Sequence, residues 1–252
     1  MRFTGDVVIV TGAARGIGKA IAEGFGREGA YVVVVDIRQE QGEETAERVC
    51  TLGGKGIFIK ADVSNQKEVL AMVEQTKNTF GKINILVNDA GICPFEDFLN
   101  ISEDLWDRVL AVNLKGYFLC SQAVAKAMIA QGIQGRLIHV SSISSMVGGA
   151  LQAHYCSSKA GINQLSACMA IALGDYGITS NCVLPGPILT DINKADLSNP
   201  EKIAYFKKRT PIKGIGAPED VVGAVLFFAS EAASYCSGAN LVVDGGILVN
   251  FQ

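Results

Sequence analysis

The chain has 252 residues, 49% of them hydrophobic, which is enough to bury one large α/β core. Its 22 basic and 25 acidic residues give a net charge of −3, so no basic excess indicates a nucleic-acid partner. No stretch approaches the ~20 apolar residues of a membrane-spanning helix, and the first residues lack a secretory-signal pattern. Seven cysteines without a C-x-x-C pair predict reduced thiols, no metal site and a cytoplasmic location.

Short runs rich in Val and Ile alternate with helix-period segments along the chain. Helices are expected near 16–29, 39–52, 69–80, 102–131 and 152–176, and from about 218 onward. The predicted strands are 6–12, 31–36, 56–62, 83–88, 135–142, 178–186 and 239–246. This alternation is typical of an α/β, doubly wound (Rossmann-type) parallel sheet of about seven strands with helices on both faces, in a single domain over 1–252.

One segment, 187–217, breaks the rhythm because it is polar, charged and interrupted by Pro200 and Pro211. It follows the sixth predicted strand, at the edge where ligands bind in such sheets. We therefore expect a substrate lid with one or two short helices.

The sequence "TGAARGIG" (11–18) joins the first predicted strand to the first predicted helix. Gly12 permits the tight turn, Gly16 lets the backbone approach a pyrophosphate, and Gly18 allows close packing of the helix. The helix N-terminus then supplies N–H groups and a positive dipole to the phosphates. The motif predicts a dinucleotide site.

Acidic residues at two strand ends refine the cofactor prediction. Asp36 ends the second strand, where its carboxylate can hold a ribose 2′-OH, and this favours NAD. Arg15 and Arg38 could instead bind a 2′-phosphate, so NADP is the alternative. Asp62 ends the third strand and could accept from the adenine amine or cap the following helix.

Together, "TGAARGIG", "NDAG" (88–91), "YCSSK" (155–159) and "PGPILT" (185–190) resemble the motifs of the short-chain dehydrogenase/reductases, in the family's order and over at least residues 5–246. The resemblance implies hydride transfer between a nicotinamide cofactor and a secondary alcohol or carbonyl. The four-residue Tyr-to-Lys interval differs from that of the family's enoyl reductases. One departure is Asp89, where the family has Asn; Asp lacks the amide donors. The positions implied to bind the cofactor are Gly12, Arg15, Gly16, Ile17, Gly18, Asp36, Ile37, Asp62, Val63, Asn88, Ala90, Gly91, Tyr155, Lys159, Pro185, Ile188 and Thr190.

The catalytic prediction centres on Tyr155 and Lys159, which share one helix face at i and i+4. A free phenol has a pKa of ~10, and a nearby ammonium favours the phenolate. Tyr155 can then exchange a proton with the substrate hydroxyl. The resemblance adds Ser142 to position the substrate oxygen and Asn113 to hold a relay water. From the residues alone, Ser141 and Ser144 rival Ser142, and Asn113 could be a helix-interior Asn bonded to its own backbone.

The predicted substrate wall is polar and suits a sugar or polyol. Its contacts are predicted to be Ser142, Ser144, Gln152, Tyr155 and Asn193. His154 is expected in the pocket wall or at the surface, and Cys156 is expected to pack. Segments 190–212 and 242–252 also resemble those of the family's sugar 1-dehydrogenases, the L-rhamnose 1-dehydrogenases in particular. The hypothesis is oxidation of an aldose or related polyol with NAD(P).

Two alternatives remain open. A 3-oxoacyl-carrier-protein reductase would use a basic lip, formed by Lys202, Lys207, Lys208, Arg209 and Lys213, to bind an acidic carrier. A non-catalytic NAD-binding sensor would not need Ser142, Tyr155 and Lys159, whose presence argues against it. Apolar surface on 102–131 and 152–176 is available for self-association, and the resemblance implies a homotetramer.

Overall fold

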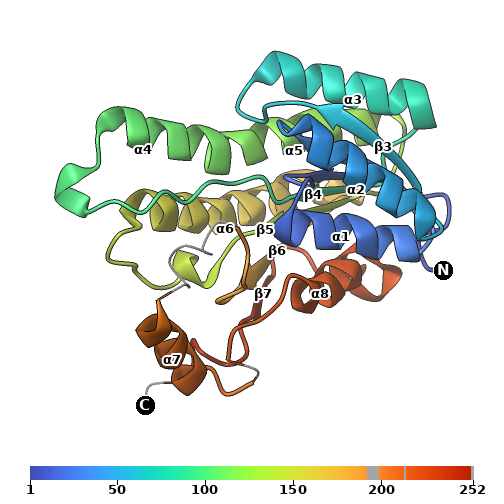
Figure 1. Cartoon of the computed structure of the whole chain (residues 1–252). Coiled ribbons are helices and arrows are strands. Elements are labelled where there is room, and N and C mark those ends of the chain that lie inside the picture. The colour runs from blue at the N-terminus through green and yellow to red at the C-terminus, as the bar shows by residue number, and fades with distance from the viewer. Residues whose placement is uncertain (192–198, 213, 251–252) are drawn as a thin grey trace.

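The computed structural model describes residues 1–191, 199–212 and 214–250. Within these ranges a seven-stranded parallel sheet has the order β3-β2-β1-β4-β5-β6-β7 (Figure 1). This confirms the doubly wound fold. The strands are β1 (Val7–Thr11), β2 (Tyr31–Asp36), β3 (Lys55–Lys60), β4 (Ile85–Asn88), β5 (Arg136–Val140), β6 (Thr179–Pro185) and β7 (Asn240–Val243).

Alternate side chains of β1 belong to two separate hydrophobic clusters, one on each face of the sheet. In β1, Val8 and Val10 pack in one cluster while Val7 and Ile9 pack in the other. Because side chains of a strand alternate between faces, a continuous apolar run is stable only where helices cover both. The described helices are α1 (Gly16–Arg27), α2 (Gln39–Thr51), α3 (Gln66–Phe80), α4 (Glu103–Leu110), α5 (Gly116–Ala130), α6 (Ala153–Leu173), α7 (Pro200–Arg209) and α8 (Glu219–Ala229).

Helices α1, α2 and α8 contribute to the first cluster and α3 and α5 to the second. Phe25 of α1 and Met128 of α5 are both fully buried, one in each cluster. The expected helix over 102–131 is continuous in direction but contains a π-helical segment, Ala111–Lys115, between α4 and α5. Such insertions are frequent at functional sites, and this one carries Asn113.

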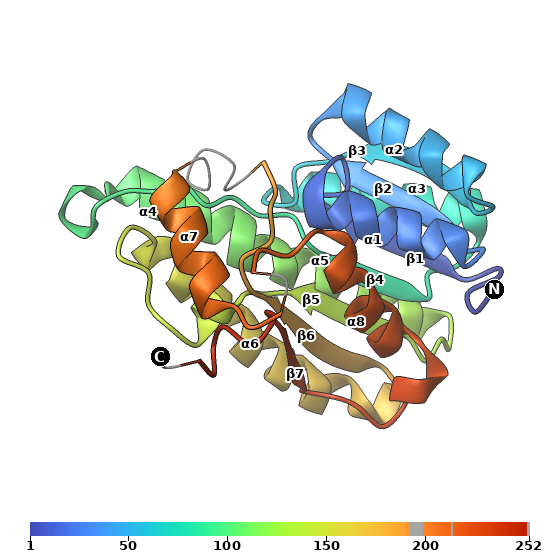
Figure 2. The same ribbon diagram turned by 60° about the horizontal axis from the view of Figure 1, so that its bottom comes forward.

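Helix α7 and the described end of the chain lie together, outside the sheet and the helices that cover it (Figure 2). The Asn250 side-chain amide donates to the Arg209 carbonyl at 2.9 Å. Helix α7 falls within the predicted lid, and residues 192–198 of that segment lie outside the described residues. Within the described part of the chain, no helix is both long enough and apolar enough to span a bilayer.

Candidate active site

The turns that follow β1 and β4 touch each other at the carboxyl edge of the sheet. The Thr11 hydroxyl accepts from the backbone N–H groups of Asp89 at 3.1 Å and Ala90 at 3.2 Å. A Cβ on Gly12 would lie 2.7 Å from the Ala90 Cα, and Gly12 has a φ of +69°. Only glycine fits a turn with both constraints. The strand order reverses between β1 and β4, so this contact lies at the topological switch point.

A cleft opens at this switch point and contains most of the predicted cofactor residues. The predicted positions that line it are Gly12, Arg15, Gly16, Ile17, Asp36, Ile37, Asp62, Val63, Ala90, Gly91, Ser142, Tyr155, Lys159, Pro185, Ile188 and Thr190. Its lining also includes Arg38, Asp89, Ile92, Ser141 and Asp191. A cleft at the N-terminus of α1, with glycines where the backbone must come close, fits a dinucleotide.

Two predicted cofactor residues are placed differently. A Cβ on Gly18 would lie 2.4 Å from the Gly12 carbonyl oxygen, so Gly18 serves helix packing as expected and does not line the cleft. Asn88 lies behind the cleft, where its amide nitrogen bonds the Ser121 hydroxyl at 3.0 Å and His139 Nδ1 at 3.1 Å. The structure therefore gives the Asn88 side chain a place in the core, because partners on α5 and β5 hold it there.

His139 is a fully buried core histidine, as its strand position predicts. Its Nε2 lies 3.1 Å from the Ser180 hydroxyl, and its Nδ1 meets Asn88. Burial lowers the pKa of His139 to about 3, so the ring is neutral at neutral pH.

At the end of the cleft formed by β2, Asp36 is buried and hydrogen-bonded. Its carboxylate accepts from the backbone N–H groups of Ala14 at 3.2 Å and Arg38 at 3.0 Å, and from the Arg38 guanidinium at 3.3 Å. Thr45 closes the network with bonds to the Ala14 and Gln41 carbonyls. Asp36 is thus fixed at the end of β2, where a ribose-binding carboxylate is needed.

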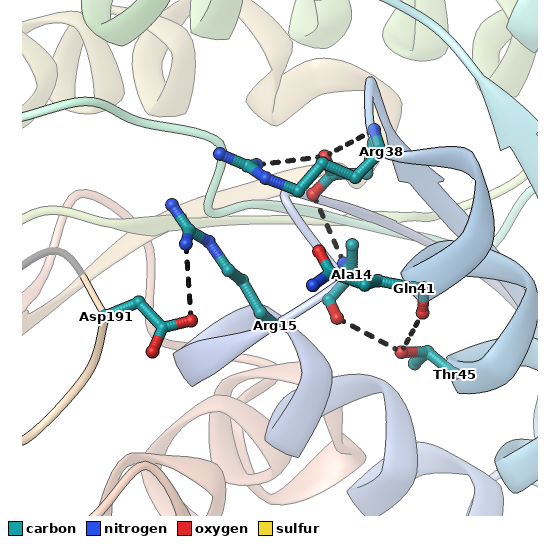
Figure 3. A network of polar contacts seen from close by, with 7 residues as sticks. Ala14, Arg15, Arg38, Gln41, Thr45 and Asp191 are labelled. Carbon is teal, nitrogen blue, oxygen red and sulfur yellow. Dashed lines mark hydrogen bonds and ion pairs between the residues drawn. The ribbon is translucent and has the colours of Figure 1, made fainter.

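Arg15 crosses the cleft and pairs with Asp191 at 3.2 Å (Figure 3). Both side chains are partly exposed, at 36% and 52%. Sequence reasoning missed Asp191, because it follows the "PGPILT" motif and 176 residues separate it from Arg15. The pair links the glycine-rich turn to the first residues of the predicted lid.

Asp62 also lines the cleft. Its carboxylate accepts from the Ser64 N–H at 2.9 Å and the Ser64 hydroxyl at 2.7 Å. The N-cap of α3 is Asn65, which accepts from the Lys67 N–H, so the alternative of Asp62 as that cap is wrong. The Asx-turn keeps the Asp62 carboxylate at the cleft wall.

At the opposite end, the Ser142 side chain lies near the Tyr155 phenol and acts to lower its pKa. The Ser142 hydroxyl also accepts from the Ser144 N–H at 3.0 Å. The rival Ser141 turns away and donates to the Lys159 carbonyl at 3.1 Å. Geometry thus favours Ser142 as the hydroxyl beside the phenol.

Lys159 is buried, and its ammonium donates to the Val140 carbonyl at 2.8 Å and to the Tyr117 hydroxyl at 3.5 Å. It lies 5.5 Å from the centroid of the Tyr155 ring. Burial lowers the pKa of Lys159 to about 8, and burial raises the pKa of Tyr155 well above its usual range. The expected lowering of the Tyr155 pKa is not seen, because desolvation of the phenol outweighs the effect of Ser142.

Asn113 is fully buried in the π-helical segment and reaches across to the loop after β4. Its oxygen accepts from the Ile92 N–H and its nitrogen donates to the Ile92 carbonyl, both at 2.9 Å. A third bond joins it to the Ser158 hydroxyl at 3.2 Å. The alternative of a side chain bonded to its own helix is therefore wrong, because the extra residue of the π turn points the amide at the loop.

The predicted substrate residues are brought only partly together. Ser142 and Tyr155 line the cleft, whereas Ser144 and Gln152 lie beside it, and Asn193 lies outside the described residues. The Gln152 amide donates to Cys93 Sγ at 3.1 Å. His154 is fully buried, not at the surface, and its Nδ1 accepts from the Tyr155 N–H at 2.8 Å.

This arrangement defines a class of protein. A dinucleotide cleft lined at one end by a serine, a tyrosine and a buried lysine is the site of a nicotinamide-dependent oxidoreductase acting on a CH–OH group. Within the described ranges, no group of three or more His, Cys, Asp or Glu residues is arranged to hold a metal ion, and none of the seven cysteines, all of which are described, is in a disulfide.

Comparison with known proteins agrees with this class. A family profile described as enoyl-(acyl carrier protein) reductase matches residues 12–248. The chain is 44% identical to the L-rhamnose 1-dehydrogenase (NADP(+)) of Thermoplasma acidophilum, over 99% of each chain, and 45% identical to the L-rhamnose 1-dehydrogenase (NAD(P)(+)) of Azotobacter vinelandii, over 100% of each. It superposes on a gluconate 5-dehydrogenase from Burkholderia cenocepacia in complex with NADP and tartrate with a TM-score of 0.93 and 32% identity, covering 98% and 97% of the two chains. The chain belongs to the short-chain dehydrogenase/reductase family and is an NAD(P)-dependent oxidoreductase.

Proposed function

We propose that the chain oxidises an aldose at C1, with L-rhamnose or a related sugar as the substrate. The observation that carries the proposal is full-length identity of 44–45% with three L-rhamnose 1-dehydrogenases. Ser142 at the catalytic end of the cleft, with the polar residues Ser144 and Gln152 beside the cleft, agrees with a hydroxyl-rich ligand.

The proposed chemistry converts the cyclic hemiacetal into a lactone. A nicotinamide cofactor bound in the cleft would supply the acceptor for the hydride of C1. Tyr155 takes the proton from the C1 hydroxyl, and Ser142 donates a hydrogen bond to the same oxygen. Lys159 supplies the positive charge that favours the phenolate, and Asn113 positions the backbone of the loop at Ile92.

For the cofactor we propose NAD, with NADP as a weaker alternative. The Asp36 carboxylate at the end of β2 is suited to accept a hydrogen bond from a ribose 2′-OH and would repel a 2′-phosphate. The Arg38 guanidinium is held by Asp36 and the Arg15 guanidinium by Asp191, so both cations already face carboxylates.

The test is an aldose panel with NAD and NADP, in which L-rhamnose is compared with its methyl glycoside. The glycoside has no free C1 hydroxyl, so it controls for oxidation at other positions. Lactone formation with L-rhamnose alone supports the proposal. Absence of reduced cofactor with every aldose would overturn it.

A 3-oxoacyl-carrier-protein reductase is the second candidate, and the basic end of α7 supports it. Lys207, Lys208 and Arg209 form the last turn of that helix, and Lys213 lies outside the described residues. A rate with carrier-linked substrate that exceeds the aldose rate and falls with salt would favour this function.

We also propose that the chain self-associates into a homotetramer, because its surface carries an apolar groove. A groove over α4, α5, the π-helical segment and α6 is lined by Leu110, Leu114, Phe118 and Leu165, and Phe118 is 42% exposed. An apolar groove of this kind suits a second copy of the chain, and sedimentation velocity would measure the oligomeric state.

A further inference from the structure

Ser142 lies in a short turn after β5 that is attached to α6 on both sides. Before it, the Ser141 hydroxyl donates to the Lys159 carbonyl at 3.1 Å. After it, the Ser145 hydroxyl oxygen lies 2.8 Å from the Asn163 amide nitrogen. Lys159 and Asn163 are four residues apart on α6, which is about one helical turn. The turn that presents Ser142 to the cleft is therefore held at two points of one helix.

The direction of each bond in the second attachment follows from the protons available. The Ser145 hydroxyl lies 2.6 Å from the Ser142 carbonyl, which can only accept, so the single Ser145 proton is used there. Asn163 must then turn its amide nitrogen toward Ser145 and donate to it. Among the residues that the structure describes, the buried oxygen of this amide has no hydrogen-bond partner. A chain of donors thus runs from Asn163 through Ser145 to the backbone of Ser142.

The same turn orients the Ser142 side chain. Its hydroxyl oxygen accepts from the Ser144 N–H at 3.0 Å, and its carbonyl accepts from the Ser145 N–H at 3.0 Å. None of the bonds within the turn uses the Ser142 hydroxyl proton, which a substrate oxygen can therefore accept. Because α6 also carries Tyr155, the attachment of the turn to α6 sets where the Ser142 hydroxyl lies relative to the phenol.

We propose that Asn163 and Ser145 are positioning residues, which hold Ser142 where its hydroxyl and the Tyr155 phenol can bond the same substrate oxygen. Neither Asn163 nor Ser145 lines the cofactor cleft, so both act through Ser142. Without the Ser145 hydroxyl the turn keeps its backbone bond but loses its link to Asn163. A misplacement of about 1 Å can lower a rate by about 10²-fold. The inference rests on the proposed role of Ser142, not on the identity of the substrate.

The experiment compares Ser145→Thr with Ser145→Val. Threonine and valine have the same shape, but only threonine keeps a hydroxyl, so any strain from the added methyl group is common to both variants. Ser145→Thr should keep kcat within about twofold of the wild type, whereas Ser145→Val should lower kcat about tenfold at an unchanged Kd for NADH. The rates are measured on whichever CH–OH substrate the wild type oxidises fastest, so failure of the sugar proposal leaves this result untouched.

Double-mutant cycles separate positioning from a general structural effect. Ser142→Ala removes the hydroxyl that the chain of bonds positions, so in that background Ser145→Val should lower kcat by less than about twofold. Asn163→Leu should lower kcat about tenfold in the wild type but by less than about twofold in the Ser145→Val background. A residue that only stabilises the fold would lower kcat by the same factor in every background.

Equal losses in Ser145→Thr and Ser145→Val would overturn this inference alone, as would equal effects of Ser145→Val with and without the Ser142 hydroxyl. Unchanged turnover in Ser142→Ala would overturn the proposed role of Ser142, and this inference with it. Crystal structures supply a second measurement that needs no substrate. Ser142 Oγ should lie farther from the Tyr155 hydroxyl in Ser145→Val than in the wild type and in Ser145→Thr, and an equal separation in all three would refute the proposal.

Discussion

The ion pair between Arg15 and Asp191 makes cofactor choice sensitive to a single carboxylate. Asp191→Asn keeps the shape of the side chain but removes its charge. The Arg15 guanidinium, now 3.2 Å from that carboxylate, can then turn toward a 2′-phosphate. We expect the preference for NADPH over NADH to increase.

The magnitude follows from the separation and the exposure. Two unit charges 3.2 Å apart attract by about 1.3 kcal/mol in water, and exposed pairs contribute about 0.2–1 kcal/mol once side-chain entropy is included. Because the exposed fractions are 36% and 52%, the lower range applies to this pair. If the variant frees up to about 1 kcal/mol of Arg15–Asp191 attraction for binding the 2′-phosphate, the ratio of the Kd for NADH to the Kd for NADPH should rise about fivefold.

The assay is NADH and NADPH binding, followed by cofactor fluorescence, at low and high salt. The Kd for NADPH should fall relative to that for NADH, and the change should shrink as salt screens the phosphate. The double variant Arg15→Gln, Asp191→Asn is the control, since it has no guanidinium to release. A gain of the same size in the Arg15→Gln background would refute the reasoning.

Three further predictions concern the catalytic end and the core. Tyr155→Phe should lower turnover by at least about 10²-fold while NADH binding, measured by fluorescence, changes less than twofold; unchanged turnover would exclude the phenol as the proton donor and acceptor. Gly18→Ala would place a Cβ 2.4 Å from the Gly12 carbonyl oxygen, so urea unfolding should show a loss of about 1–3 kcal/mol and NADH binding should weaken; wild-type values for both would contradict the close approach. The pKa of His139 is about 3 in the folded protein, against 6.5 for an unperturbed histidine. Its neutral ring therefore contributes fully to the free energy of unfolding above pH 6.5, and this contribution is lost as pH falls toward 3. Between pH 8 and pH 5 this loss is about 2 kcal/mol in urea unfolding and should be absent from the pH dependence of His139→Gln; an equal pH dependence in both proteins would show that His139 is not the cause.

The fold was predictable because strand composition and turn chemistry agree along the whole chain. Runs such as Val7–Thr11 and Tyr31–Asp36 are apolar on both faces, which only a sheet covered on both sides accommodates. The π-helical segment at Asn113 was not predictable, since helical periodicity carries no signal for one inserted residue. The same limit applies to the ends of strands, which shift by up to three residues, as in β7.

The candidate site was predictable where its parts lie within one motif. Tyr155 and Lys159 share a helix face, so their spacing alone brings them together. The pairing of Arg15 with Asp191 joins two distant segments, and nothing in either local sequence indicates the other. The inward turn of the Asn88 side chain depends likewise on Ser121, which only the packing of α5 on β4 reveals.

Burial explains why the pKa values of the catalytic pair differ from those expected from spacing alone. An i, i+4 ammonium would lower the pKa of an exposed phenol, but Tyr155 and Lys159 are both desolvated, and desolvation favours the neutral form of each. The buried Lys159 ammonium is stabilised because the Val140 carbonyl and the Tyr117 hydroxyl accept hydrogen bonds from it. The pair is therefore arranged as a neutral phenol beside a buried ammonium, which is the form that donates a proton in reduction. Oxidation needs the phenolate, so it depends on the charge that Lys159 retains.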